Sequence, residues 1–140
     1  MSEYWGTIRL THLGKTDRKI CSDFFDKYSS KITDIELDTR VGQRWPKLIR
    51  TPAWMNKDIQ SLSKRRIDLA FTLKSTGEKF VCEITPTLTA EVVGRILLYV
   101  TLYKRLGKTM APVYGGFIGR RTEPEAAAMA TEMGIHLWLI

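Results

Sequence analysis

The pattern of apolar positions predicts two neighbouring β-strands in the middle of the chain. Ile67–Leu73 and Phe80–Ile84 are runs rich in apolar, β-branched and aromatic residues. They flank the turn-forming triplet Ser75-Thr76-Gly77. The stretch from Arg65 to Thr85 is therefore a predicted β-hairpin.

Each predicted strand carries one carboxylate in an otherwise apolar context. Asp68 lies near the start of the first strand and Glu83 near the end of the second. In an antiparallel pair these two ends lie side by side. A buried charge is costly unless it is paired or binds a metal, so the two acids indicate a shared ligand. The alternative interpretation is that both side chains face solvent.

Periodicities before the hairpin predict a helix and a strand. Apolar side chains recur at three- and four-residue steps from Lys19 to Ile32, which is typical of an amphipathic helix. Apolar and polar residues alternate from Ile35 to Val41, which predicts a half-buried strand. Residues 4–10 fit a short strand or an N-terminal arm, and residues 14–17 supply turn and cap residues.

After the hairpin the pattern alternates between helices and strands. A helix with an apolar stripe from Val92 to Leu106 is expected to start at a cap on Thr87 or Thr89 and to end at Gly107. Residues 111–119 predict a buried strand. The pair Thr122 and Glu125 predicts a capping box that opens a helix ending at Gly134, and residues 135–140 predict a last strand.

This order of elements predicts one α/β domain over residues 1–140. Meandering strands come first and a β-α-β-α-β succession follows, which favours a mixed central β-sheet flanked by helices. A right-handed crossover places the helix after Glu83 across one face of the sheet.

Composition and charge narrow the class of protein. The chain has 140 residues, 44% hydrophobic and 26% charged, as in ordinary globular domains. It has no apolar run long enough for a membrane helix and no signal-peptide pattern at its start, so we expect a cytoplasmic protein. Cys21 and Cys82 lie in a predicted helix and strand and are expected to be reduced core residues. With only His12 and His136, a metal would be held by oxygen ligands, which favours Mg²⁺ or Mn²⁺.

The formal net charge of +7 favours an anionic partner, of which nucleic acid is the commonest. Cations concentrate between about residues 42 and 66, a basic loop or insertion with interleaved tryptophans. Phosphates attract cations and unstacked bases lie on indole rings, so the segment fits a nucleic-acid contact. A solvated loop anchored by its tryptophans is the alternative. The candidate nucleic-acid-binding residues are Arg44, Trp45, Lys47, Arg50, Lys64, Arg65 and Arg66.

The hairpin resembles the signature of the PD-(D/E)XK nuclease superfamily, which includes restriction endonucleases and archaeal Holliday junction resolvases. Ile67-Asp68-Leu69-Ala70 is similar to the first element of that signature. Glu83-Ile84-Thr85 is similar to its E-x-K element, with threonine in place of lysine. The resemblance in element order runs from about Lys19 to Ile140 and implies a restriction endonuclease-like αβββαβ core with a C-terminal αβ extension.

What the resemblance implies is a metal-dependent DNA endonuclease or exonuclease. Asp68, Glu83 and Thr85 occupy the catalytic positions, and Asp68, Glu83 and the Ile84 carbonyl would hold Mg²⁺ or Mn²⁺. A core this small is expected to act as a homodimer. A further acid would come from Asp26, Glu36 or Asp38, among which the sequence does not choose.

Thr85 cannot supply the charge of the family's lysine, so substitutes and other functions stay open. Lys79 is about 13 Å along the strand from Glu83 and is a poor replacement. Arg66, or Arg95 reaching back from the following helix, is nearer. One alternative function is a catalytically inactive nuclease-like fold that serves as a nucleic-acid-binding or assembly module. Another is a basic protein-interaction subunit with no nucleic-acid role.

Overall fold

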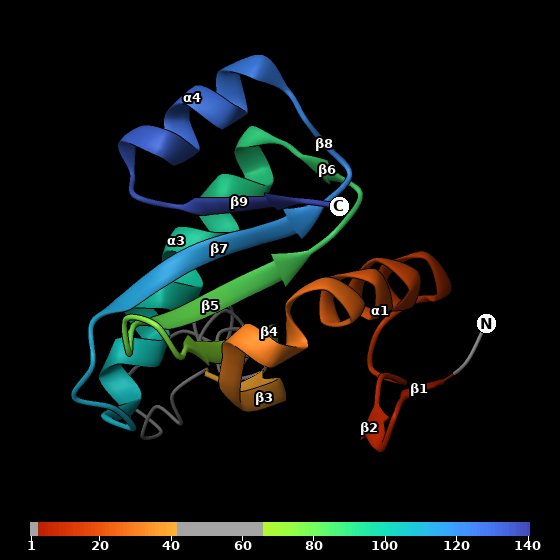
Figure 1. Ribbon diagram of the computed structural model, residues 1–140. Coiled ribbons are helices and arrows are strands. Elements are labelled where there is room, and N and C mark those ends of the chain that lie inside the picture. The colour runs from red at the N-terminus through yellow and green to blue at the C-terminus, as the bar shows by residue number, and fades with distance from the viewer. Residues whose placement is uncertain (1–2, 42–65) are drawn as a thin grey trace, which may run out of the picture.

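A computed structural model describes residues 3–41 and 66–140, and its centre is a mixed five-stranded sheet (Figure 1). The strand order is β3-β4-β5-β7-β9, in which the first two pairings are antiparallel and the last two are parallel. The predicted α/β class with a mixed sheet is confirmed. The bounds are β3 (Ile32–Arg40), β4 (Arg66–Leu73), β5 (Lys79–Ile84), β7 (Val113–Gly119) and β9 (His136–Leu139).

Helices cover both faces of this sheet. Helix α1 (Lys15–Tyr28) packs on one face, while α3 (Ala90–Leu106) crosses the other, with α4 (Pro124–Glu132) beside it. The β5-α3-β7 and β7-α4-β9 units join parallel strands, as the crossover rule requires. The smaller elements are β1 (Tyr4–Trp5), β2 (Ile8–Arg9), the 3₁₀ helix η1 (Ser29–Lys31), β6 (Thr87–Leu88) and β8 (Arg121–Thr122).

Strand alternation divides the core into layers. Leu69 and Phe71 of β4 and Cys82 of β5 pack against α1, whereas Ala70 and Val81 pack against α3. Both faces of β4 and β5 are therefore apolar and buried. Any polar side chain at the end of these two strands must be compensated by a partner.

The first helix begins earlier than its periodicity predicts. Helix α1 starts at Lys15 instead of Lys19 and ends at Tyr28, after which one turn of 3₁₀ helix completes the predicted segment. Its first turn contains polar residues only, so apolar spacing does not reveal it. The shift moves Asp17 from a predicted turn into the first turn of the helix.

One of the two predicted helix caps is confirmed. Thr89 Oγ1 accepts a hydrogen bond from Val92 N at 3.3 Å, and Gly107 ends α3 with a φ of 65°. The capping box at Thr122 is wrong, because α4 begins at Pro124 after Glu123, which makes no side-chain cap. Thr122 instead belongs to β8, whose pairing with β6 holds the chain in an extended conformation there.

The prediction that both cysteines are core residues is confirmed, and two tyrosines of α3 lie in the core as well. Tyr99 and Tyr103 are buried between α3 and the sheet. Cys21 and Cys82 are buried free thiols in the layer between α1 and the sheet. His136 lies on the edge strand β9, with its ring centroid 4.8 Å from that of Phe80.

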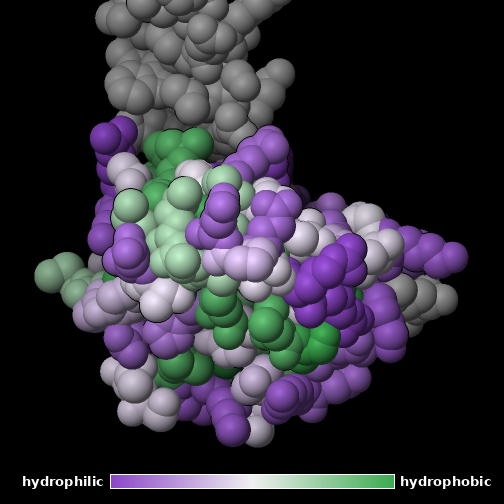
Figure 2. Space-filling view, turned by 90° about the horizontal axis from the view of Figure 1, so that it is seen from above, coloured by the Kyte–Doolittle hydropathy of each residue, from purple (hydrophilic) through white to green (hydrophobic). Residues whose placement is uncertain are grey.

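The outer surface carries scattered apolar side chains. Met129 of α4, Met133 directly after this helix and Leu139 of β9 are exposed. Seen from above, apolar residues form small patches near the middle of the face, with polar residues around them (Figure 2). Among the described residues, no helix is both long and apolar enough to cross a membrane.

Gly119 offers a test of the close packing at the C-terminal ends of β5 and β7. A Cβ at this position would lie 2.2 Å from the Thr85 carbonyl oxygen and 2.3 Å from Cζ of Phe117. We expect Gly119→Ala to lower the free energy of unfolding by about 1–3 kcal/mol, because the backbone must shift. Urea denaturation followed by circular dichroism measures this change.

Gly94→Ala is the matched control. Gly94 lies inside α3 with open space around its Cα. Here alanine is expected to stabilise the protein by about 0.5–1 kcal/mol through helix propensity. Equal urea midpoints for the two variants would contradict the assignment of Gly119 to a packing constraint.

Candidate functional site

The structure brings Asp68 and Glu83 together at the end of the β4–β5 ladder. The register pairs Leu69 with Cys82, so the next residues outward are the two acids. Asp68 Oδ2 accepts a hydrogen bond from the backbone N–H of Ile84 at 3.0 Å. The Asp68 carboxylate, and not a backbone carbonyl of β4, therefore accepts the hydrogen bond from the last residue of β5.

Arg95 of α3 is the cation nearest to this pair. Its Nη1 donates a hydrogen bond to Glu83 Oε1 at 2.8 Å, and its Nη2 lies 3.6 Å from Glu91 Oε1 one turn earlier. Glu83 itself is only 7% exposed. The Arg95 side chain is 32% exposed, so the ion pair joins a buried carboxylate to a partly solvated guanidinium.

Burial raises the pKa of both carboxyl groups. The pKa of Asp68 rises to about 6, mainly through burial, with Asp17 and Asp38 adding repulsion and the Ile84 N–H and Arg95 opposing the rise. The pKa of Glu83 rises to about 7 through burial and the charge of Asp68, against the opposing hydrogen bond from Arg95. One arginine does not neutralise two neighbouring carboxylates, so the site favours a further positive charge or a proton.

Asp17 is a third acid that sequence reasoning missed. It lies in the first turn of α1, and its charge raises the pKa of both Asp68 and Glu83. Burial also raises the pKa of Asp17 itself. The polar start of the helix hid it, although an acid in a helical first turn after Gly14 is a usable signal.

The three acids considered from the sequence have other contacts. Asp26 Oδ1 accepts a hydrogen bond from Trp5 Nε1 at 2.7 Å. Asp38 Oδ2 lies 3.2 Å from Arg66 Nη1. The charge of Asp38 makes only a minor contribution to the raised pKa of Asp68. Glu36 belongs to a separate network.

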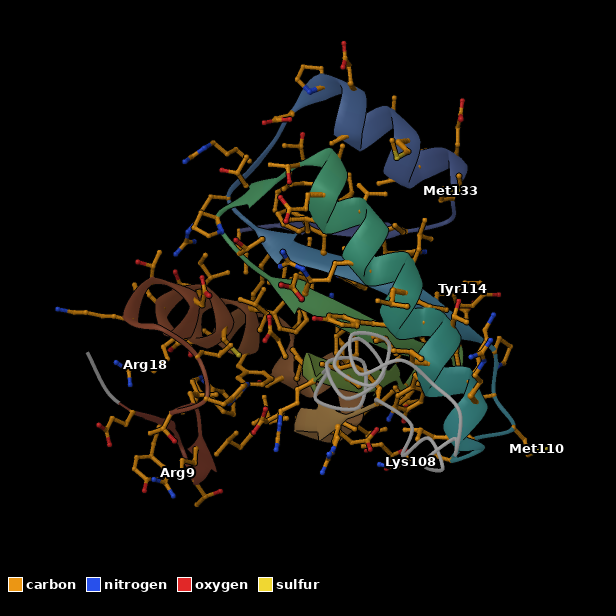
Figure 3. All side chains as sticks on the ribbon, turned by 180° about the vertical axis from the view of Figure 1, so that it is seen from behind. Arg9, Arg18, Lys108, Met110, Tyr114 and Met133 are labelled. Atoms are coloured by element: carbon orange, nitrogen blue, oxygen red, sulfur yellow. The ribbon has the colours of Figure 1, made fainter. Side chains whose placement is uncertain are left out.

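That network lies at the C-terminal end of α3. Glu36 accepts from Lys79 Nζ at 2.9 Å and Lys108 Nζ at 3.1 Å, and also from the Tyr103 hydroxyl. Burial opposes ionisation, yet these hydrogen bonds lower the pKa of Glu36 to about 2. Together with Asp34 they line a cavity of about 510 Å³. Figure 3, viewed from the α3 side, shows Lys108 just past the end of that helix.

These contacts distinguish the three cations considered as substitutes for the lysine of the family signature. Lys79 is buried and paired with Glu36, and Arg66 is exposed and paired with Asp38. Arg95 alone among the three forms a hydrogen bond with one of the site carboxylates. At Thr85 the backbone N–H donates to Ile118 O at 3.2 Å, which ties the end of β5 to β7.

His12 connects the N-terminal segment to the same place. Its Nε2 lies 3.0 Å from the backbone oxygen of Asp68, and the side chain is half-buried. The contact fixes the backbone of β4 where Asp68 projects. The sequence held no signal for it, because residues 12 and 68 are distant along the chain.

Two carboxylate oxygens of the site are available to a divalent cation. Asp68 Oδ1 and Glu83 Oε2 make no hydrogen bond or ion pair within residues 3–41 and 66–140. In the same part of the chain, no group of three or more His, Cys, Asp or Glu side chains is placed to hold a metal. Two carboxylate oxygens with backbone and water oxygens fit Mg²⁺, which keeps several waters in proteins.

The remaining nucleic-acid candidates lie outside the described residues. They are Arg44, Trp45, Lys47, Arg50, Lys64 and Arg65. No protein-family model matches the chain, and neither a curated protein nor a solved structure does. Function must therefore be argued from the geometry of the site.

The raised pKa values predict how stability depends on pH. The folded protein binds protons at Asp68 and Glu83 more tightly than the unfolded chain. Their stabilising contribution is full below pH about 4 and is lost as pH rises through about 6 to 7. Between pH 5 and 8 we expect a loss on the order of 2 kcal/mol from these groups, measured by urea denaturation with chelator present.

The double variant Asp68→Asn/Glu83→Gln should flatten this pH dependence, because neither amide titrates. Glu125→Gln, an exposed acid in the first turn of α4, serves as the control and should keep the wild-type slope. A double variant with an unchanged slope would show that other groups cause it.

Proposed function

We propose that the protein is a metal-dependent nuclease of the PD-(D/E)XK type that cleaves phosphodiester bonds in DNA. The observation that carries the proposal is the pair of carboxylates of half-buried Asp68 and buried Glu83, at adjacent strand ends with one oxygen each left without a partner in the described chain. The α1-β3-β4-β5-α3-β7 order supports it, since this is the order that the resemblance implies.

Asp68, Glu83 and the Ile84 carbonyl are the groups that would hold Mg²⁺ or Mn²⁺. Bound there, the cation would polarise the phosphodiester and stabilise the leaving oxygen. Asp17 adds negative charge next to these ligands and so strengthens the attraction for a cation. His12 holds the Asp68 backbone in place.

Arg95 is our candidate for the role that lysine has in the family. A guanidinium has five N–H donors; here Nη1 binds Glu83 and Nη2 lies 3.6 Å from Glu91, and the N–H groups that remain can face a phosphate oxygen. It reaches the site from α3, whereas Thr85 in β5 brings no charge. In this proposal the positive charge that the family has on the strand, at the position of Thr85, comes instead from the neighbouring helix.

Cleavage assays test this proposal directly. Purified protein is incubated with linear duplex, branched and single-stranded DNA in Mg²⁺ or Mn²⁺. We expect Asp68→Asn and Glu83→Gln to slow cleavage at least about 100-fold, equivalent to about 2.7 kcal/mol of barrier. Arg95→Met should slow it about 10²–10³-fold through lost charge at the phosphate, with partial recovery in Arg95→Lys.

Glu125→Gln and Lys104→Ala serve as charge-matched controls on exposed surfaces and should cleave at the wild-type rate. Isothermal titration with Mn²⁺ gives a second readout, in which the Asp68→Asn variant loses binding. Absence of cleavage on all three substrates, together with Mn²⁺ binding unchanged in Asp68→Asn, would refute the nuclease.

A catalytically inactive nucleic-acid-binding or assembly module is the second candidate. It is favoured by Thr85 in the lysine position and by the Arg95–Glu83 ion pair, which already compensates one carboxylate. In that case DNA binding needs no metal, persists in Glu83→Ala and weakens steeply with salt. Gel-shift titrations at two salt concentrations in the presence of chelator distinguish the inactive module from the nuclease. A nuclease that contacts its substrate through the metal loses affinity for DNA when the chelator removes the metal.

A further inference from the structure

A second cavity, of about 550 Å³, lies at the other end of β4 from Asp68. Its walls come from the 3₁₀ helix η1, the last residue of β4 and the β4–β5 turn. The backbone N–H of Lys74 donates to the Lys31 carbonyl at 3.0 Å, which joins the two walls. The lining residues are Ser30, Lys31, Leu73, Lys74 and Ser75.

Two lysines and two serines are among the lining residues, and none of the lining residues is acidic. Lys31 and Lys74 are exposed, and neither is in an ion pair with an acidic side chain within the described chain. Lys27 adds a third cation nearby, because both Lys27 and Lys31 hold their ammonium groups over the Tyr28 ring, at 5.3 and 5.9 Å from its centroid. Lysine and serine side chains are common donors to phosphate oxygens.

The backbone around the cavity is held in a defined conformation. The turn is closed by Gly77 N–H to Leu73 O at 2.8 Å and by Leu73 N–H to Glu78 O at 2.9 Å. Gly77 has a φ of 74°, which favours glycine and fixes the turn geometry. Lys74 therefore stands on a rigid turn opposite Lys31, whereas most surface lysines have no fixed neighbour of like charge.

We propose that this cavity binds a backbone phosphate of nucleic acid at a distance from the scissile bond. The inference rests on the proposed nuclease function and adds a second contact to it. From Asp68 to Leu73 the strand advances about 17 Å. The phosphates of one DNA strand rise about 3.4 Å each along the helix axis and also wind around it, so a gap of about 17 Å spans only a few nucleotides.

The experiment compares two double variants in metal-free buffer. Lys31→Ala/Lys74→Ala removes the cavity cations, and Lys104→Ala/Arg105→Ala removes the same charge from the exposed end of α3. Fluorescence anisotropy with a labelled 20-base-pair duplex should show a Kd raised about 10-fold or more for the first and less than about 3-fold for the second. The slope of log K against log salt should fall by about 2 for the first variant.

Two further measurements complete the test. Inorganic phosphate should shift the amide NMR signals of Lys74 and Ser75 in the wild type and leave them unshifted in Lys31→Ala/Lys74→Ala. Lys31→Arg/Lys74→Arg should retain duplex affinity, which excludes loss of folding as the cause. Equal duplex affinity of the two alanine variants would overturn the proposal, and so would phosphate binding without any effect on duplex affinity.

These outcomes are separate from those of the cleavage assay. If the cavity variant loses duplex affinity while the wild type cleaves nothing, the phosphate site stands and the nuclease fails. If the wild type cleaves DNA but the cavity variant binds and cleaves normally, the nuclease stands and the phosphate site fails. In the expected result the variant raises KM and retains kcat, because the cavity is remote from the reacting atoms.

Discussion

The functional end of this molecule depends on the repulsion between two carboxylates held at neighbouring strand ends. Asp68 and Glu83 are both largely removed from water, and only Arg95 provides a charged hydrogen bond to either of them within the described chain. Burial is the main cause that raises both pKa values, and at Glu83 the charge of Asp68 adds a repulsion that a medium of low dielectric constant screens weakly. An added cation or proton lowers the free energy of such a pair, and this property suits a metal-dependent reaction.

The surrounding fold maintains that unfavourable arrangement. Leu69 and Cys82, next to the acids, are fully buried, so the strand ends cannot turn outward without exposing the core. The Ile84 N–H uses one oxygen of Asp68, and α3 delivers Arg95 from the opposite layer. The unfavourable free energy of the two carboxylates at one end of the sheet is thus offset by hydrophobic burial along its length.

Charge at the other end of the sheet is arranged differently. Glu36 is saturated by Lys79, Lys108 and Tyr103, and its lowered pKa makes it a structural anion. Lys31 and Lys74 instead line a cavity without acids. The distribution suggests a protein whose negative charge attracts metal at one place and whose positive charge attracts phosphate at another.

The sequence by itself determined the α/β class, the central hairpin and most strand positions, because apolar alternation and turn residues are local signals. It also placed Asp68 beside Glu83, since an antiparallel hairpin leaves little choice of register. Only the tertiary structure decided which distant groups reach them: Asp17 from a polar helix start, Arg95 from the next helix and His12 from the N-terminal segment. Whether side chains from different layers come close depends on the angles at which the elements pack and on where each helix begins. The spacing of residues along the sequence does not specify either of these.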